Sequence, residues 1–178
     1  MKSQIATPKG FRAKKKRSVA GSADGRRPIA IQKILVPTDF SPASKKAFSY
    51  ALRLAEERGS EITLLHVLEA ETPLMSAGRP TAAAFSKQEL THVEEGLRAL
   101  VDFAQTAGVA DAASIVRTGV ATHEIIEAAK ELDVDLIVIA THGFTASKHF
   151  ALGSTAERVA RAAPCPVFVV REKEHDFI

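Results

Sequence analysis

The apolar residues of this chain follow two alternating patterns from residue 32 onward. Short, nearly continuous apolar runs have the length of buried strands, and longer segments with apolar residues every three or four positions have the period of an α-helix. Five strands are predicted, at 33–37, 61–68, 112–116, 136–140 and 167–171. Four helices are predicted between them, at 42–58, around 90–104, from Thr122 to about 132 with Ile125, Ile126, Ala129 and Leu132 as the apolar face, and at 154–162.

Strict alternation of strands and helices is typical of an α/β fold. Strands that are apolar along most of their length need cover on both faces, which is typical of a parallel sheet. We therefore expect a single domain with an open, twisted, five-stranded parallel sheet of order 3-2-1-4-5, helices on both faces and a Rossmann-like arrangement. Ligands of such sheets bind beyond the carboxyl ends of the strands where the order reverses, here between strands 1 and 4.

Residue types at the segment ends predict several helix boundaries. Ser41 followed by Pro42 favours a helix start, because serine caps the first turn and proline suits its first position. Gly59 favours the end of that helix. At the last helix, Ser154 and Glu157 have the spacing of a capping box, in which the serine side chain itself caps the helix.

The segment 136–155 has the most informative pattern in the chain. A buried strand over 136–140 runs into Thr141-His142-Gly143, and a helix opens at Gly153-Ser154-Thr155. Backbone N–H groups at a helix start have no partner within the helix, and the helix dipole adds positive charge there. A strand, a glycine loop and a helix start are therefore typical of a phosphate site.

Several nucleotide-binding classes are excluded by missing motifs. The chain has no G-x-x-x-x-G-K-[ST] loop and no G-x-G-x-x-G after its first strand, so neither a P-loop nor a dinucleotide site is expected. A response regulator would carry acidic residues after strands 1 and 3. This chain has Asp39 after strand 1 but Arg117-Thr118-Gly119 after strand 3.

Four motifs together resemble the universal stress protein family. They are Val36-Pro37-Thr38-Asp39, Leu65-His66-Val67, Thr141-His142-Gly143 with nine residues before Gly153-Ser154, and Cys165-Pro166-Val167. The resemblance covers roughly residues 31–173, and the joint spacing is far more specific than any single motif.

The resemblance implies an adenine-nucleotide site that binds ATP or a relative, with Mg²⁺ or Mn²⁺ only alongside the nucleotide. Pro37, Thr38 and Asp39 would line the adenine and ribose, and the backbone of Val67 would meet adenine. Ile139 and Ala140 would border the ribose and phosphates. The phosphates would be held by Gly143, Gly153, Ser154 and Thr155, with the cationic loop side chains His142, Lys148 and His149 as secondary candidates.

Ala140 departs from the family pattern, which has glycine at this position. If the position needs a positive φ, alanine costs on the order of 1 kcal/mol. If glycine serves only for close approach, a small shift accommodates one methyl group. ATP binding is therefore conditional on the site accommodating alanine at position 140.

Several of these residues also have structural interpretations. Asp39 favours a helix N-terminus with or without a ligand. His66 lies within an apolar strand, where a hydrogen-bonded core residue is more common than a catalyst. Cys165, between two prolines, is expected to pack as a small apolar side chain rather than to do redox chemistry.

The sequence predicts a nucleotide-binding stress or signalling module. No activated nucleophile with a base is recognisable, so no catalytic residue is assigned and hydrolysis is expected to be slow at most. The alternatives are a nucleotide-independent dimeric stress protein, and a weak hydrolase in which Asp39 or His142 orients water. No dedicated metal cage is recognisable.

The last strand bears on assembly. An apolar strand at a sheet edge is a template for pairing with another molecule. The family resemblance likewise implies antiparallel pairing of this strand, and we expect a homodimer through Val167–Val170.

Charge divides the chain unevenly. Residues 1–30 hold nine Lys or Arg and one acid, whereas the remainder has a net charge of −5. We expect a disordered basic tail at 1–30, a domain at 31–173 and a short tail at 174–178. Contact of the basic tail with nucleic acid or an anionic surface, or an organelle transit role, is the less favoured interpretation. One cysteine and no apolar segment of membrane-spanning length favour a cytoplasmic protein.

Overall fold

Strands and helices alternate in the structure as the apolar pattern predicts. The computed structural model describes residues 30–69, 85–141 and 152–173. Within these residues the strands are β1 (Lys33–Pro37), β2 (Glu61–Leu68), β3 (Ala112–Thr118), β4 (Leu136–Ala140) and β5 (Val167–Val170). The helices are α1 (Pro42–Arg58), α2 (Lys87–Thr106), α3 (Ala121–Leu132) and α4 (Ser154–Ala162).

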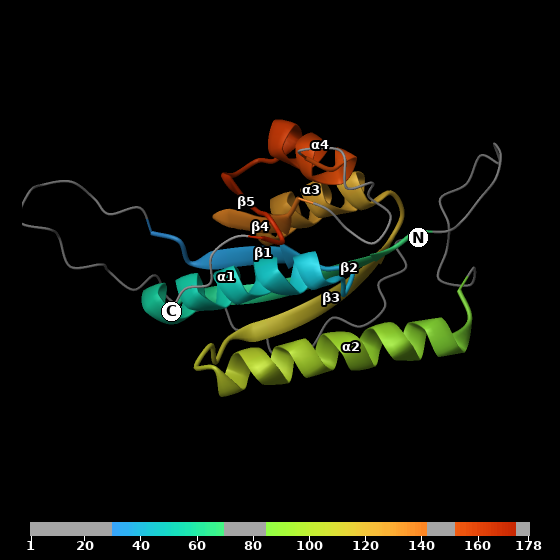
Figure 1. Cartoon of the computed structure of the whole chain (residues 1–178), viewed down its shortest axis with the longest axis horizontal. Coiled ribbons are helices and arrows are strands. Elements are labelled where there is room, and N and C mark those ends of the chain that lie inside the picture. The colour runs from blue at the N-terminus through green and yellow to red at the C-terminus, as the bar shows by residue number, and fades with distance from the viewer. Residues whose placement is uncertain (1–29, 70–84, 142–151, 174–178) are drawn as a thin grey trace, which may run out of the picture.

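The five strands form one parallel sheet of order β3-β2-β1-β4-β5, which confirms the predicted topology (Figure 1). At the centre of the sheet, Ile34 of β1 pairs with Ile62 of β2 on one side and Leu136 of β4 on the other. After β1 the chain adds β2 and then β3 on one side, and β4 and then β5 follow on the other side of β1. The strand order therefore reverses between β1 and β4. Ligands of open parallel sheets bind at such a point.

Each face of the sheet has its own apolar core. α1 and α2 cover one face, and α3 and α4 cover the other (Figure 1). Successive side chains of β1 alternate between the two: Ile34 and Val36 enter the α1–α2 core, and Leu35 enters the α3–α4 core. All three are 1% exposed or less. Burial on both faces explains why the strands read as almost continuous apolar runs.

The predicted limits of α1 are confirmed. The Ser41 hydroxyl accepts a hydrogen bond from the Ser44 amide at 3.1 Å, and Pro42 is the first helical residue. Gly59 ends the helix in the left-handed region, with φ of 67°. The serine hydroxyl caps the start of the helix, and the glycine adopts the left-handed conformation that ends it.

The predicted capping box at α4 is wrong. Gly153 is the N-cap, Ser154 is the first helical residue, and no side chain caps this end. The Glu157 carboxylate instead pairs with Arg161 one turn later, at 2.9 Å. With the cap one residue earlier than predicted, the serine and glutamate lie in the first helical turn and no longer have capping-box geometry.

Smaller differences concern β3, α3 and β5. β3 continues to Thr118, so Arg117 belongs to the strand and does not follow it. α3 begins at Ala121, one residue before the predicted Thr122, and β5 ends at Val170 rather than at 171. The buried side of α3 also differs from the predicted apolar face, and it comprises Glu124, Ile125, Ala128 and Ala129.

None of the helices in the described parts of the chain combines the length and apolar character needed to cross a lipid bilayer.

Candidate functional site

The carboxyl ends of β1 and β4 lie side by side at the reversal point of the sheet. Pro37 ends β1 and Ala140 ends β4, and both residues are buried. α1 begins a few residues after β1, and α4 begins near the end of β4. Two strand ends and two helix starts therefore surround one region. Most of the residues that the sequence singles out in the described part of the chain lie here.

The start of α4 is fixed directly to the end of β4. The Thr141 amide donates to the Val170 carbonyl of β5 at 2.9 Å, and the Gly153 amide donates to the Thr141 carbonyl at 2.8 Å. Gly153 and Thr155 are partly exposed, and Ser154 is exposed. The N-cap Gly153 supplies no side-chain cap, and among the described residues no side chain caps this helix. Its first-turn N–H groups and the positive end of its dipole therefore lie at a partly accessible surface.

Ala140 occupies an ordinary strand position. It pairs with Val170 of β5, is 9% exposed and packs in the α1–α2 core. Among the described non-glycine residues, only Phe40 and Asp133 have positive φ. The alanine at this position therefore carries no left-handed strain, and its methyl group fills core space. The cost that a positive φ would impose on alanine therefore does not apply at position 140.

Thr38 is buried at the end of β1, with each of its polar groups engaged. Its amide donates to the Leu65 carbonyl at 2.8 Å. Its hydroxyl lies 3.1 Å from the Ser44 hydroxyl and accepts from the Phe40 amide at 3.1 Å. Its carbonyl contacts Nδ1 of His66 at 2.8 Å. The polar groups of Thr38 thus organise the turn between β1 and α1.

Asp39 shapes the same turn and is partly exposed. Its Oδ1 accepts a hydrogen bond from the Ser41 amide at 3.1 Å, just before α1 begins. The carboxylate therefore has the structural role that a helix start predicts. A carboxylate oxygen can accept more than one hydrogen bond, so this role is compatible with a ribose contact.

His66 lies beneath the turn and is hydrogen-bonded, as predicted. Its ring stacks on Phe40, with centroids 4.9 Å apart and an interplanar angle of 25°. Burial lowers the pKa of His66, while the bond to the Thr38 carbonyl and the charge of Asp39 act in the opposite direction. The imidazole is therefore neutral near pH 7.

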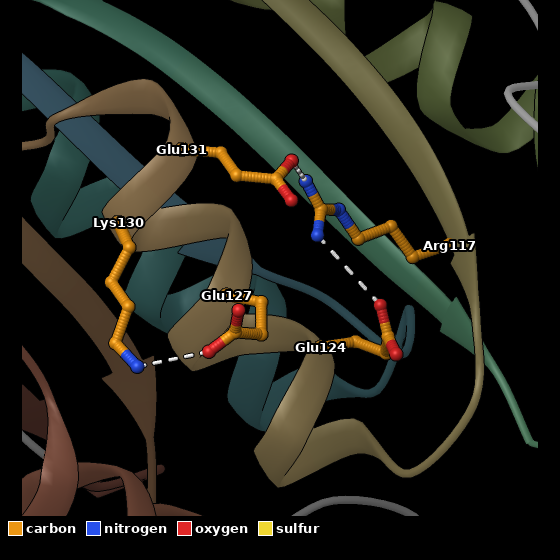
Figure 2. Close-up of polar contacts among 5 residues, drawn as sticks. All are labelled: Arg117, Glu124, Glu127, Lys130 and Glu131. Carbon is orange, nitrogen blue, oxygen red and sulfur yellow. Dashed lines mark hydrogen bonds and ion pairs between the residues drawn. The ribbon is translucent and has the colours of Figure 1, made fainter. Parts of the chain in front are cut away.

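Val67, the residue expected to meet adenine, is half-buried on β2 and pairs with Arg117 of β3. Arg117 connects β3 to α3: its guanidinium contacts Glu131 at 2.5 Å and Glu124 at 3.7 Å (Figure 2). Glu124 is only 4% exposed. Sequence reasoning missed this buried carboxylate, because its partner lies on another element and a glutamate in a first helical turn is ordinary.

Cys165 is half-buried and packs against the α3–α4 core. Burial, with a smaller effect from Asp135, raises the pKa of its thiol. A raised pKa disfavours the reactive thiolate, which agrees with the predicted apolar role.

Four candidate residues, His142, Gly143, Lys148 and His149, lie outside the described residues. Within 30–69, 85–141 and 152–173, no three His, Cys, Asp or Glu side chains are grouped as a metal site would require.

The sheet order, the reversal point and the helix start beside β4 define a Rossmann-like α/β protein. The family model for the universal stress protein family matches residues 30–171. A universal stress protein of Methanocaldococcus jannaschii is 31% identical over 145 residues, which cover 82% of this chain and 85% of the relative. A putative one of Staphylococcus haemolyticus is 31% identical over 148 residues, covering 82% and 88%. The chain belongs to the universal stress protein family.

Solved structures agree with this assignment. The universal stress protein UspA from Lactobacillus plantarum is 30% identical, with a TM-score of 0.71 over 79% of this chain and 98% of its own. A universal stress protein in complex with cAMP is 23% identical, with a TM-score of 0.62 over 81% and 99%. One from Archaeoglobus fulgidus in complex with dAMP is 20% identical, with a TM-score of 0.59 over 80% and 98%. The last two likenesses establish the shared fold.

Proposed function

We propose that this universal stress protein binds ATP or a related adenine nucleotide at the carboxyl ends of β1, β2 and β4, and acts as a stress-response or signalling module. The observation that carries the proposal is the start of α4, which has no side-chain cap and is hydrogen-bonded to the end of β4. By contrast, Ser41 caps α1, Ser86 caps α2, and Glu69 accepts from the Ala121 amide at the start of α3. Unpaired N–H groups and a helix dipole suit an anionic phosphate.

The residues proposed for the site divide by the part of the nucleotide that they would contact. Adenine and ribose would contact Pro37, Thr38, Asp39 and the backbone of Val67. The ribose and phosphates would be bordered by Ile139 and Ala140, and the phosphates would be held by His142, Gly143, Gly153, Ser154 and Thr155. Thr38 and Ala140 would line the site without supplying a free side-chain hydrogen bond, because the amide, carbonyl and hydroxyl of Thr38 are already hydrogen-bonded and the Ala140 methyl lies in the core.

The ligand class is supported by two family members whose structures hold cAMP and dAMP. Both ligands combine an adenine base, a sugar and one phosphate. ATP is proposed as the ligand here because the family motif continues from Gly143, across nine residues, to Gly153-Ser154 and the helix start there.

Slow hydrolysis at most is the proposed chemical behaviour. His66 donates to a main-chain carbonyl, and Asp39 accepts from the Ser41 amide, so these neighbouring polar side chains serve the turn. A Mg²⁺ or Mn²⁺ ion is proposed only with bound nucleotide. It would be held mainly through phosphate oxygens and water, as hard cations commonly are in nucleotide sites.

We also propose a cytoplasmic homodimer formed through β5. β5 is an outer strand of the sheet, and Phe168 at its middle is 41% exposed. An exposed apolar edge invites pairing with a second chain. A role of the basic residues 1–30 in contacting nucleic acid or an anionic surface remains the less favoured alternative.

Two measurements test nucleotide binding. Calorimetric titration with ATP, ADP and AMP should give saturable binding, with guanosine triphosphate as the control for the base. Denatured, freshly purified protein should release adenine nucleotide that mass spectrometry identifies. No heat with any adenine nucleotide, together with no released nucleotide, would favour the nucleotide-independent dimer. Phosphate release well above background would favour the hydrolase.

A further inference from the structure

The turn between β1 and α1 has a backbone shape that its sequence does not favour. Phe40 has φ of 64°, in the left-handed region that bulky residues rarely adopt. Such residues persist where surrounding contacts over-determine them, and they are common at functional sites. The turn joins Thr38 and Asp39, both proposed to line the nucleotide. The contacts that hold this shape therefore bear on the site.

The Phe40 ring contacts two other elements. It stacks on His66 of β2. It also lies against Gly96 of α2, where an added Cβ atom would come within 2.9 Å of Cε1 of Phe40. The close approach of α2 depends on the missing side chain at position 96. Phe40 is thus enclosed by contacts from outside its own turn.

His66 also makes the hydrogen bond that fixes the peptide group before Asp39. A carbonyl oxygen can only accept a hydrogen bond, so Nδ1 of His66 carries a hydrogen and donates it to the hydrogen bond with the Thr38 carbonyl. The Thr38 carbonyl and the Asp39 amide belong to one planar peptide unit. Holding the carbonyl therefore fixes the orientation of the whole unit and, with it, the direction in which the chain enters Asp39.

We propose that His66 is a positioning residue for nucleotide binding. Its Nδ1 proton holds the Thr38 carbonyl and its ring holds Phe40, so that the Asp39 carboxylate is presented to the ribose side of the ligand. This inference rests on the proposed nucleotide site. His66 itself need not touch the nucleotide, and its effect passes through Asp39.

Two substitutions of similar polarity separate this role from general packing. In His66→Asn the side-chain amide nitrogen can occupy nearly the place of Nδ1 and donate to Thr38. In His66→Gln the amide lies one bond farther out, near the level of Nε2. We expect ATP affinity to fall about tenfold in His66→Gln, as for loss of a well-placed hydrogen bond. In His66→Asn it should remain within about threefold of wild type, since that bond is retained.

A double-mutant cycle tests whether the effect passes through Asp39. Asp39→Asn should weaken ATP binding, and adding His66→Gln to it should cause little further loss, because the two residues act on one contact. Equal affinities of the Asn and Gln variants, or fully additive losses with Asp39→Asn, would overturn the proposal. If His66→Gln failed to fold, His66→Ala with added imidazole would replace it, and absence of rescue would count against the proposal.

A ligand-free measurement distinguishes failure of this inference from failure of the proposed function. The Phe40 and Ser41 amides donate to Thr38 and Asp39 within the turn, so their hydrogen exchange reports its integrity without nucleotide. Exchange should be faster in His66→Gln than in wild type and His66→Asn. Wild-type protein that bound no nucleotide would refute the proposed function. Unchanged exchange in His66→Gln, with ATP still bound by wild type, would refute the positioning role alone.

Discussion

Gly119 and Glu124 lie so close that a Cβ atom at position 119 would be 2.8 Å from Oε1 of the glutamate. Gly119 also has φ of 151°, which side chains rarely adopt. The glycine therefore admits a nearly buried carboxylate between the end of β3 and the first turn of α3. This carboxylate meets Arg117, the register partner of Val67. The cluster supports the sheet beside the proposed adenine contact.

Gly119→Ala should destabilise the protein by about 2 kcal/mol, because it combines backbone strain with displacement of Glu124. Gly59→Ala is the matched control: its φ is also positive, at 67°, but an added Cβ meets nothing within 4 Å. That variant should lose only about 1 kcal/mol from strain. Urea unfolding measures both. Equal losses would show that the contact with Glu124 costs nothing.

Arg117→Met should lower the free energy of unfolding by about 2 kcal/mol, since a buried carboxylate loses its cationic neighbour. Lys130→Met is the matched control: it removes a cation on α3 that pairs with Glu127 at 2.9 Å (Figure 2) but is largely exposed. The free energy of unfolding of this variant should fall by less than about 0.5 kcal/mol. Adding Glu124→Gln to Arg117→Met should recover part of the stability. A double variant as unstable as the summed single variants would contradict this coupling.

His66 should make stability depend on pH below neutrality. Its pKa is lowered in the folded protein from an ordinary value of 6.5, so the unfolded chain binds the proton first as the pH falls. The contribution of the neutral imidazole is complete above about pH 6.5 and is lost as the pH falls towards the folded-state pKa. Urea unfolding at pH 7.5 and 5.5 should show a larger loss for wild type than for His66→Asn. An identical loss in both proteins would exclude His66 as its source.

Ser154→Asp should weaken ATP binding at least about tenfold, because it places a negative charge where the phosphates are proposed to bind. The same change should leave the fold intact or slightly stabilised, since aspartate suits the first turn of a helix. Calorimetry and thermal unfolding measure the two effects separately. Ser154→Asn, similar in size but neutral, is the control. Unchanged ATP affinity in the aspartate variant would remove α4 from the proposed site.

Val169→Pro should convert the proposed homodimer to a monomer. The Pro166 carbonyl accepts from the Ile137 amide of β4, and the Val170 carbonyl accepts from the Thr141 amide just after β4. Alternation therefore places the backbone groups of Val169 on the free edge. Proline there removes an outward N–H group and is tolerated on an edge strand. Sedimentation velocity at micromolar concentration should show dimeric wild type and a monomeric variant. A monomeric wild type would end the dimer proposal.

The fold could be predicted because its signals are local and repeated. The apolar run from Lys33 to Pro37 and the serine, proline and glycine around α1 each specify one boundary, and the structure agrees with all of them. The capping box at Ser154 failed for a local reason as well. A serine with a glutamate three residues on has the same spacing whether it precedes the helix or begins it.

The interior of the site depends on contacts that no local pattern records. Phe40 lies in a backbone region that its residue type disfavours, and its stacking partner His66 is on another strand. The pairing of Arg117 with Glu124 likewise joins a strand to a helix. Tertiary contacts override residue preference at these positions, so sequence alone identifies the residues without their arrangement.

The hydrogen bond from Gly153 to Thr141 has a consequence for how this family can diversify. Because it joins Thr141 directly to Gly153, it fixes the two residues between which the segment 142–152 runs. We expect that substitutions within this segment would change what meets the proposed ligand while the bond from Gly153 to Thr141 keeps the start of α4 in place. In the proposed site, the framework would supply the anion anchor and the connecting residues could differ in selectivity.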